Sequence, residues 1–80
     1  MLNKNIIRVV IVEDDDIIRE SFVSLINSSE KYLCIADYDT CEATLKNLTQ
    51  DSPQIILMDI GLPGISGIEG IRRIKKVYSK

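Results

Sequence analysis

Three short runs of apolar residues recur along the 80-residue chain, separated by stretches with helical spacing. The runs cover about Ile6 to Val12, Tyr32 to Ala36 or Asp37, and Gln54 to Met58. Short β-branched and aliphatic runs of this kind are typical of buried strands in a parallel sheet. The pattern therefore predicts three strands.

Helices are predicted after the first two runs by their capping residues. Asp15 or Asp16 can cap a helix that runs to about Asn27. A second helix starts at Asp39 or Thr40 and ends within 51–53, because the proline there cannot continue it. A polar turn over residues 28–31 joins the first helix to the second predicted strand.

A loop rich in glycine and proline, 61–67, follows the third run. Ser66, followed three residues later by Glu69, is a capping box that opens a third helix. The basic residues of this helix are interpreted as a solvated outer face rather than a nucleic-acid patch: Arg72, Arg73, Lys75 and Lys76.

Apolar side chains recur on one face of each predicted helix. These positions are Ile18, Phe22, Leu25 and Ile26 in the first helix, Cys41, Leu45 and Leu48 in the second, and, facing inward, Ile68, Ile71, Ile74 and Tyr78 in the third. Alternating strands and helices predict an α/β fold with a parallel sheet. Right-handed crossovers place the first strand between the other two, in the order 2-1-3.

Composition and charge fit one soluble domain. Apolar residues make up 45% of the chain and charged residues 28%, which is ordinary for a globular protein. The net charge of -2 gives no reason to expect nucleic-acid binding. Arg8 interrupts the first apolar run and acids follow it, so we expect neither a signal peptide nor a membrane span, and a cytoplasmic location.

The two cysteines, Cys34 and Cys41, are predicted to be reduced core thiols. Cys34 lies in the second apolar run and Cys41 near the start of the second helix. The chain has no histidine and no second cysteine pair, so the spacing of a zinc site is missing.

Acidic residues follow two of the predicted strands directly. Glu13-Asp14-Asp15-Asp16 comes after the first run, and Asp59 comes after the third. In open α/β sheets, ligands bind outside the carboxyl ends of the strands, where the strand order reverses. With the order 2-1-3, Glu13, Asp14 and Asp59 converge there, and carboxylates so close repel one another unless a cation lies between them. Asp15 and Asp16 are interpreted as the acidic start of the first helix.

Together these residues resemble the receiver domain of two-component response regulators. The resemblance rests on strands that end in Glu13-Asp14 and Met58-Asp59, and on the Leu62-Pro63-Gly64 loop with Gly67 at the head of the next helix. It covers the whole chain and implies an incomplete flavodoxin-like three-layer sandwich. The stretch from 66 to 75 resembles receivers that carry a C-terminal helix-turn-helix output domain.

The resemblance also implies roles for the matching residues. Asp59 is expected to accept a phosphoryl group from the phosphohistidine of a sensor histidine kinase. Glu13, Asp14, Asp59 and the backbone carbonyl of Gly61 are expected to bind Mg²⁺, which takes oxygen ligands. The residues expected to shape the loop are Pro63, Gly64 and Gly67.

The resemblance stops after the third helix, so residues 1–80 are expected to form a partial receiver domain. Two strands and two helices of the family have no counterpart, nor do the Ser or Thr and the Lys that end its fourth and fifth strands. Lys75, Lys76 and Lys80 do not replace that lysine, because they lie on or after the third helix. We therefore expect slow phosphorylation without a switch, and marginal stability or self-association through the bare edge of the third strand.

Two other functions remain open besides a receiver, which is not itself expected to be an enzyme. A phosphatase of the haloacid-dehalogenase type also uses a strand-end aspartate with Mg²⁺. It needs a second aspartate two residues later, where this chain has Gly61. A truncated pseudo-receiver would act only as an interaction module. The spacing of Gly61, Gly64 and Gly67 matches no nucleotide-binding fingerprint.

Overall fold

The computed structural model describes residues 5–77. Its elements, in chain order, are β1 (Ile7–Val12), α1 (Asp16–Asn27), β2 (Tyr32–Tyr38), α2 (Cys41–Asp51), β3 (Ile55–Met58) and α3 (Gly67–Val77). This order confirms the predicted α/β alternation. The strands differ from their expected bounds only at their ends, with β1 and β3 starting one residue later and β2 reaching Tyr38. Tyr78 and Lys80 lie outside the described residues.

All three strands are parallel, and β1 lies between the other two in the order β2-β1-β3. This confirms the predicted order 2-1-3 and the flavodoxin-like arrangement. The register places Val12 of β1 opposite both Tyr38 of β2 and Met58 of β3. The three strands therefore end level with one another, and the residues that follow them leave the sheet side by side.

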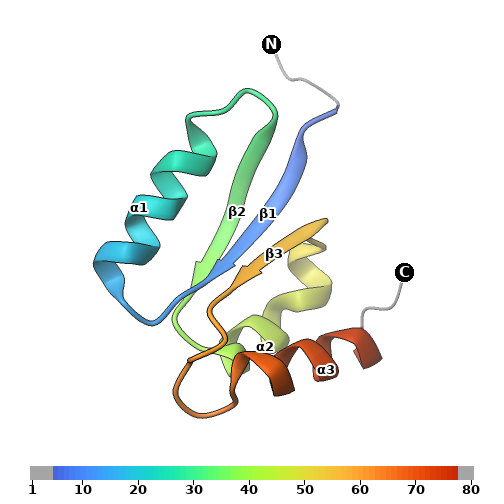
Figure 1. The fold of residues 1–80 in the computed structure, drawn as a ribbon. Coiled ribbons are helices and arrows are strands. Elements are labelled where there is room, and N and C mark those ends of the chain that lie inside the picture. The colour runs from blue at the N-terminus through green and yellow to red at the C-terminus, as the bar shows by residue number, and fades with distance from the viewer. Residues whose placement is uncertain (1–4, 78–80) are drawn as a thin grey trace.

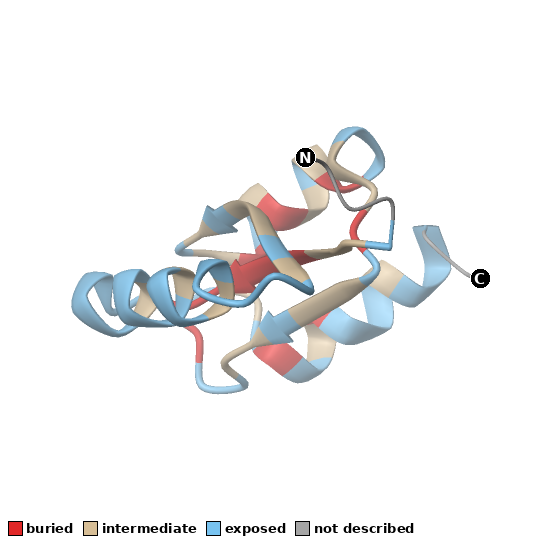
Figure 2. Cartoon of the chain, turned by 90° about the horizontal axis from the view of Figure 1, so that it is seen from above, coloured by how far each residue is buried: buried red, intermediate tan, exposed pale blue. Residues whose placement is uncertain are grey.

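The helices cover the sheet from two sides, with α1 on one face and α2 and α3 on the other (Figure 1). The central strand is buried over most of its length (Figure 2). Four successive residues of β1, Val9 to Val12, are each only 1% exposed. Such a continuous apolar run is what a strand covered on both faces requires.

The main core cluster lies between the sheet and the pair α2–α3. Its buried members are Val10, Val12, Cys41 and Leu62. Burial raises the pKa of the Cys41 thiol, with a smaller contribution from Glu42, so this thiol stays protonated as predicted for a reduced core cysteine. Cys34 is also a free thiol but is only half-buried.

The apolar stripe of α1 is covered only in part. No residue of this helix is buried, Phe22 is 42% exposed and Leu25 is 66% exposed. Leu57 of β3 is also 40% exposed. The helix packs on β1 and β2, so the side of the sheet that β3 contributes is left partly open.

α3 turns its glycines toward the rest of the molecule. Gly67 and Gly70 are buried, whereas Ile68 is 66% and Ile71 is 42% exposed. The prediction that Ile68 faces inward was therefore wrong. The physical reason is close packing: a Cβ on Gly70 would lie 2.5 Å from the sulfur of Cys41, and only a residue without a side chain permits this approach.

The helices begin at predicted caps. Asp15, Thr40 and Ser66 each accept a hydrogen bond from the backbone N–H three residues ahead. The capping box of α3 is only half formed, because the carboxylate of Glu69 pairs with Arg73 at 3.1 Å. No helix within residues 5–77 is both long and apolar enough to cross a bilayer.

Candidate functional site

Backbone hydrogen bonds extend the sheet one residue beyond its strands and fix the first acids of the site. The Asp59 N–H donates to the Val12 carbonyl at 3.0 Å, and the Glu13 N–H donates to the Tyr38 carbonyl at 3.0 Å. Glu13 and Asp59 therefore leave neighbouring strands at the same level, at the carboxyl end of the sheet.

Three carboxylates converge at this end. Glu13, Asp14 and Asp59 each offer one oxygen, and these oxygens lie within 4.8 Å of one another. Opposite ligands of an octahedral Mg²⁺, each bound at about 2.1 Å, lie about 4.2 Å apart. Small side-chain adjustments would therefore let the three oxygens share one ion. Glu13 is 9% exposed, while Asp14 is open to solvent.

Two backbone N–H groups orient the carboxylates. The Gly61 N–H donates to Oδ1 of Asp59 at 2.9 Å, which leaves Oδ2 without a donor among residues 5–77. The Asp15 N–H donates to Oε2 of Glu13 at 3.1 Å. In both carboxylates one oxygen is held by the chain and the other is available to a ligand.

The neighbouring acids are neutralised in other ways. Arg19 pairs with Asp16 at 2.6 Å and with Asp37 at 3.0 Å, while Asp15 caps α1. Within residues 5–77, Glu13, Asp14 and Asp59 form no ion pair. Three converging carboxylates without a positive partner favour the binding of a cation.

A cavity of about 390 Å³ adjoins the acids on the α1 side of the sheet. Glu13 and Asp59 form its polar end, and Phe22 and Leu57 form part of its apolar wall. The apolar lining limits the number of polar groups that can compete for the carboxylate oxygens.

Glycines shape the loop after Asp59 in two different ways. Gly64 has a φ of 72°, a left-handed conformation that side chains other than glycine rarely adopt. A Cβ on Gly67 would lie 2.4 Å from the Cα of Ile60, so α3 can begin against the backbone of the loop that follows Asp59 only with glycine there. Pro63 is exposed.

Sequence reasoning missed two residues that contact the site's supporting segments. Arg19 lies three residues after Asp16 on α1, a spacing at which charged side chains pair, so its ion pair could have been anticipated. Glu42 accepts a hydrogen bond from the Ile65 N–H at 3.4 Å across 23 residues of sequence. No local pattern indicates such a contact.

Comparison with known proteins agrees with this geometry. Residues 9–80 match the family model described as "Response regulator receiver domain". The chain belongs to this family. As a receiver domain, it is a module of two-component signalling.

Individual relatives show how much of a response regulator the receiver chain covers. It is 33% identical over 71 residues to the transcriptional regulatory protein YdfI of Bacillus subtilis, covering 89% of the chain and 33% of YdfI. The structure of a two-component response regulator of the LuxR family from an Aurantimonas species superposes with a TM-score of 0.86 at 30% identity, covering 91% of the chain and 52% of that protein. The chain spans about a third of the length of the first relatives it matches.

An isolated receiver gives the same fold. The signal receiver domain of the response regulator NarL from Mycobacterium tuberculosis superposes with a TM-score of 0.85 at 23% identity. The alignment covers 91% of this chain and 59% of that domain.

Proposed function

We propose that this receiver domain accepts a phosphoryl group on Asp59 from the phosphohistidine of a sensor histidine kinase. The single observation that carries the proposal is the convergence of Glu13, Asp14 and Asp59 at the ends of two adjacent strands. The group would hold Mg²⁺ together with the Gly61 carbonyl. When bound, the ion would neutralise the carboxylates and withdraw charge from the phosphoryl oxygens.

Asp59 is the nucleophile in this proposal. Its Oδ2 attacks phosphorus, so that an O–P bond forms while the P–N bond of the phosphohistidine breaks. The imidazole nitrogen leaves with the electron pair and takes up a proton. The Gly61 N–H, bound to Oδ1 at 2.9 Å, restricts rotation of the carboxylate and so keeps the other oxygen oriented, which is the positioning that phosphoryl transfer depends on.

We further propose that residues 1–80 are the first part of a cytoplasmic receiver domain whose full-length parent carries a DNA-binding output domain. Receiver domains are generally not enzymes, and we propose none here. The phosphatase alternative has little support, since Gly61 occupies the position where a second aspartate would act as general acid.

Incubation with Mg²⁺ and a small acyl-phosphate donor, followed by intact-mass measurement, tests the function. We expect an adduct of one phosphoryl group that hydroxylamine removes, because an acyl phosphate is cleaved by this nucleophile. The adduct should be lost in Asp59→Asn and kept in Asp39→Asn, a change of the same kind at an exposed acid. Turnover of a phosphate ester without an adduct would favour the phosphatase, and no adduct at all would favour a pseudo-receiver.

A further inference from the structure

Arg19 joins three segments at the carboxyl end of the sheet. Its Nη1 donates to the Glu13 carbonyl at 2.8 Å, its Nη2 to the Asp16 carboxylate at 2.6 Å, and its Nε to the Asp37 carboxylate at 3.0 Å. The side chain is only 15% exposed. One guanidinium thus links the β1–α1 turn, the first turn of α1 and the end of β2.

The contact with Glu13 fixes the turn that presents the acids. The Glu13 N–H donates to the Tyr38 carbonyl, and the Glu13 carbonyl accepts from Arg19. Both backbone groups of Glu13, the residue before Asp14, are therefore held by hydrogen bonds. A planar guanidinium can serve three acceptors at once in fixed directions, whereas a lysine ammonium is a flexible point charge.

We propose that Arg19 is a positioning residue for the metal site, which holds the β1–α1 turn so that Glu13 and Asp14 meet Asp59. The inference rests on the proposed Mg²⁺ site. Groups that orient metal ligands without touching the metal commonly change metal affinity by about 10- to 100-fold when they are replaced. Arg19 is such a group, because it holds the main-chain carbonyl of Glu13 and would not touch the metal itself.

Positioning and charge predict different effects of substitutions at Arg19. If Arg19 acted only as a positive charge beside the acids, its removal would strengthen Mg²⁺ binding, because the site would become more negative. If Arg19 positions the turn, its removal weakens binding despite that gain. Arg19→Lys keeps the positive charge but replaces the planar guanidinium that donates the three hydrogen bonds. Arg19→Gln removes the charge and most of the donors.

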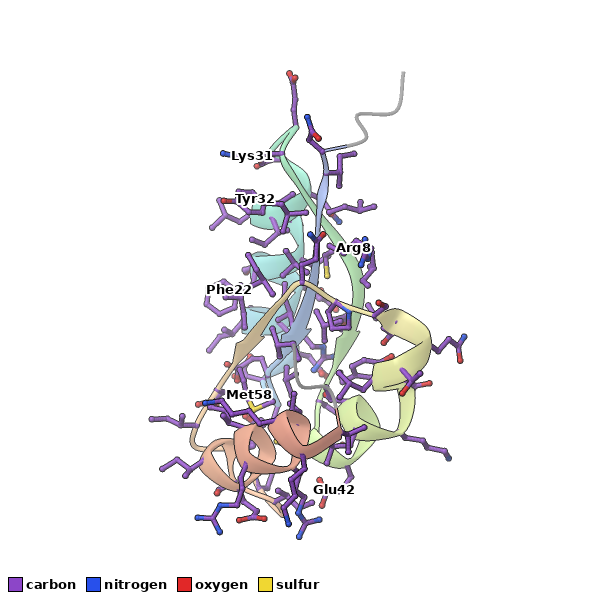
Figure 3. All side chains as sticks on the ribbon, turned by 90° about the vertical axis from the view of Figure 1, so that its right-hand side faces the viewer. Arg8, Phe22, Lys31, Tyr32, Glu42 and Met58 are labelled. Atoms are coloured by element: carbon purple, nitrogen blue, oxygen red, sulfur yellow. The ribbon has the colours of Figure 1, made fainter. Side chains whose placement is uncertain are left out.

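Arg8 supplies a matched control. It lies on β1, and its Nε and Nη2 donate to the Ser52 carbonyl at 3.0 and 2.7 Å. It lies toward the end of the molecule that carries Lys31 and Tyr32, away from Glu42 (Figure 3). Arg8→Lys likewise removes guanidinium hydrogen bonds to a main-chain carbonyl, but at a position away from Glu13, Asp14 and Asp59.

The test is a calorimetric titration with Mg²⁺ at a temperature where circular dichroism shows each variant to be folded. We expect Arg19→Lys to raise the Kd by about 10-fold and Arg8→Lys to leave it unchanged. An unchanged Kd in Arg19→Lys would overturn the proposal. Should that variant not fold, Arg19→Gln decides, since weaker binding supports positioning and equal or tighter binding contradicts it. Absence of Mg²⁺ binding by the unsubstituted chain would instead count against the proposed function.

Discussion

The aspartates and glutamates at the carboxyl end of the sheet differ in what surrounds their charge. Asp16 and Asp37 share Arg19, whereas Asp14 and Asp59 lie in the group of three acids without an ion pair among the described residues. Identical side chains therefore have different chemistry according to their partners. The sequence pattern predicted the three acids, because each one follows a strand directly or one residue later. Of the contacts of Arg19, only the pair with Asp16 follows from local spacing. Its bonds to Asp37 and to the Glu13 carbonyl depend on the fold.

Tyr38 offers a residue-scale prediction about pH. It donates a hydrogen bond to Asp51 at 2.5 Å, and burial, with the bond to Asp51, raises its pKa from 10.0 to about 12. The folded protein thus binds this proton more tightly than the unfolded chain. The contribution to stability is complete below about pH 10 and is lost as the pH rises toward 12.

Thermal unfolding as a function of pH measures this effect. We expect the unsubstituted chain to lose stability between pH 10 and 12 more steeply than Tyr38→Phe does. Tyr32→Phe removes a tyrosine that lies at the other end of β2, and it should keep the steep loss. Equal pH slopes in the Tyr38→Phe and unsubstituted chains would contradict the assignment.

Helices and strands were predicted well where the signal is local. The caps at Asp15, Thr40 and Ser66 depend on residues only three positions apart, and the strands depend on continuous apolar runs. The orientation of α3 could not be predicted in the same way. The helical spacing of its apolar residues places Ile68 on the inward face, whereas in the structure Ile68 is exposed to solvent. What decides the orientation is the close approach to Cys41 that Gly70 permits, a contact between distant parts of the chain.

Gly70→Ala tests this packing at the scale of elements. The added Cβ would lie 2.5 Å from Cys41 Sγ and 3.3 Å from Met58 Sδ, and overpacking costs about 1–3 kcal/mol. Alanine gains about 1 kcal/mol over glycine within a helix, so we expect a net loss of stability in chemical denaturation.

A double-mutant cycle separates the two effects. The loss caused by Gly70→Ala should shrink in a Cys41→Ala background, where the sulfur is absent. Gly61→Ala is the control, since its Cβ would meet only Oδ1 of Asp59, at 3.6 Å. If Gly70→Ala alone stabilised the protein, α2 and α3 would not approach each other as closely as the structure shows.

The whole molecule leaves one side of its sheet incompletely covered. Phe22 and Leu25 of α1 and Leu57 of β3 are between 40% and 66% exposed. β3 ends the sheet with an edge that no other strand among residues 5–77 pairs. Unpaired edges beside apolar surface favour association between chains. The sequence predicted this bare edge from the order of strands, although not how open the face of α1 is.

Sedimentation across a range of concentrations measures the association. We expect species larger than a monomer at high concentration, and less of them in Leu25→Lys. Ile68→Lys is the matched control, because Leu25 and Ile68 are both 66% exposed but Ile68 lies on α3. This variant should associate like the unsubstituted chain. A monomer at every concentration, with one sharp unfolding transition, would contradict this prediction.

The most direct test of the central claim is to locate a bound divalent ion by nuclear magnetic resonance. Mn²⁺, which also prefers oxygen ligands, broadens the signals of nuclei near it. We predict that the amides of Asp14, Asp59 and Gly61 broaden first, that Mg²⁺ reverses the effect, and that Lys31 at the far end is spared. Uniform broadening, or broadening that begins away from these three residues, would contradict the shared metal site on which the account depends.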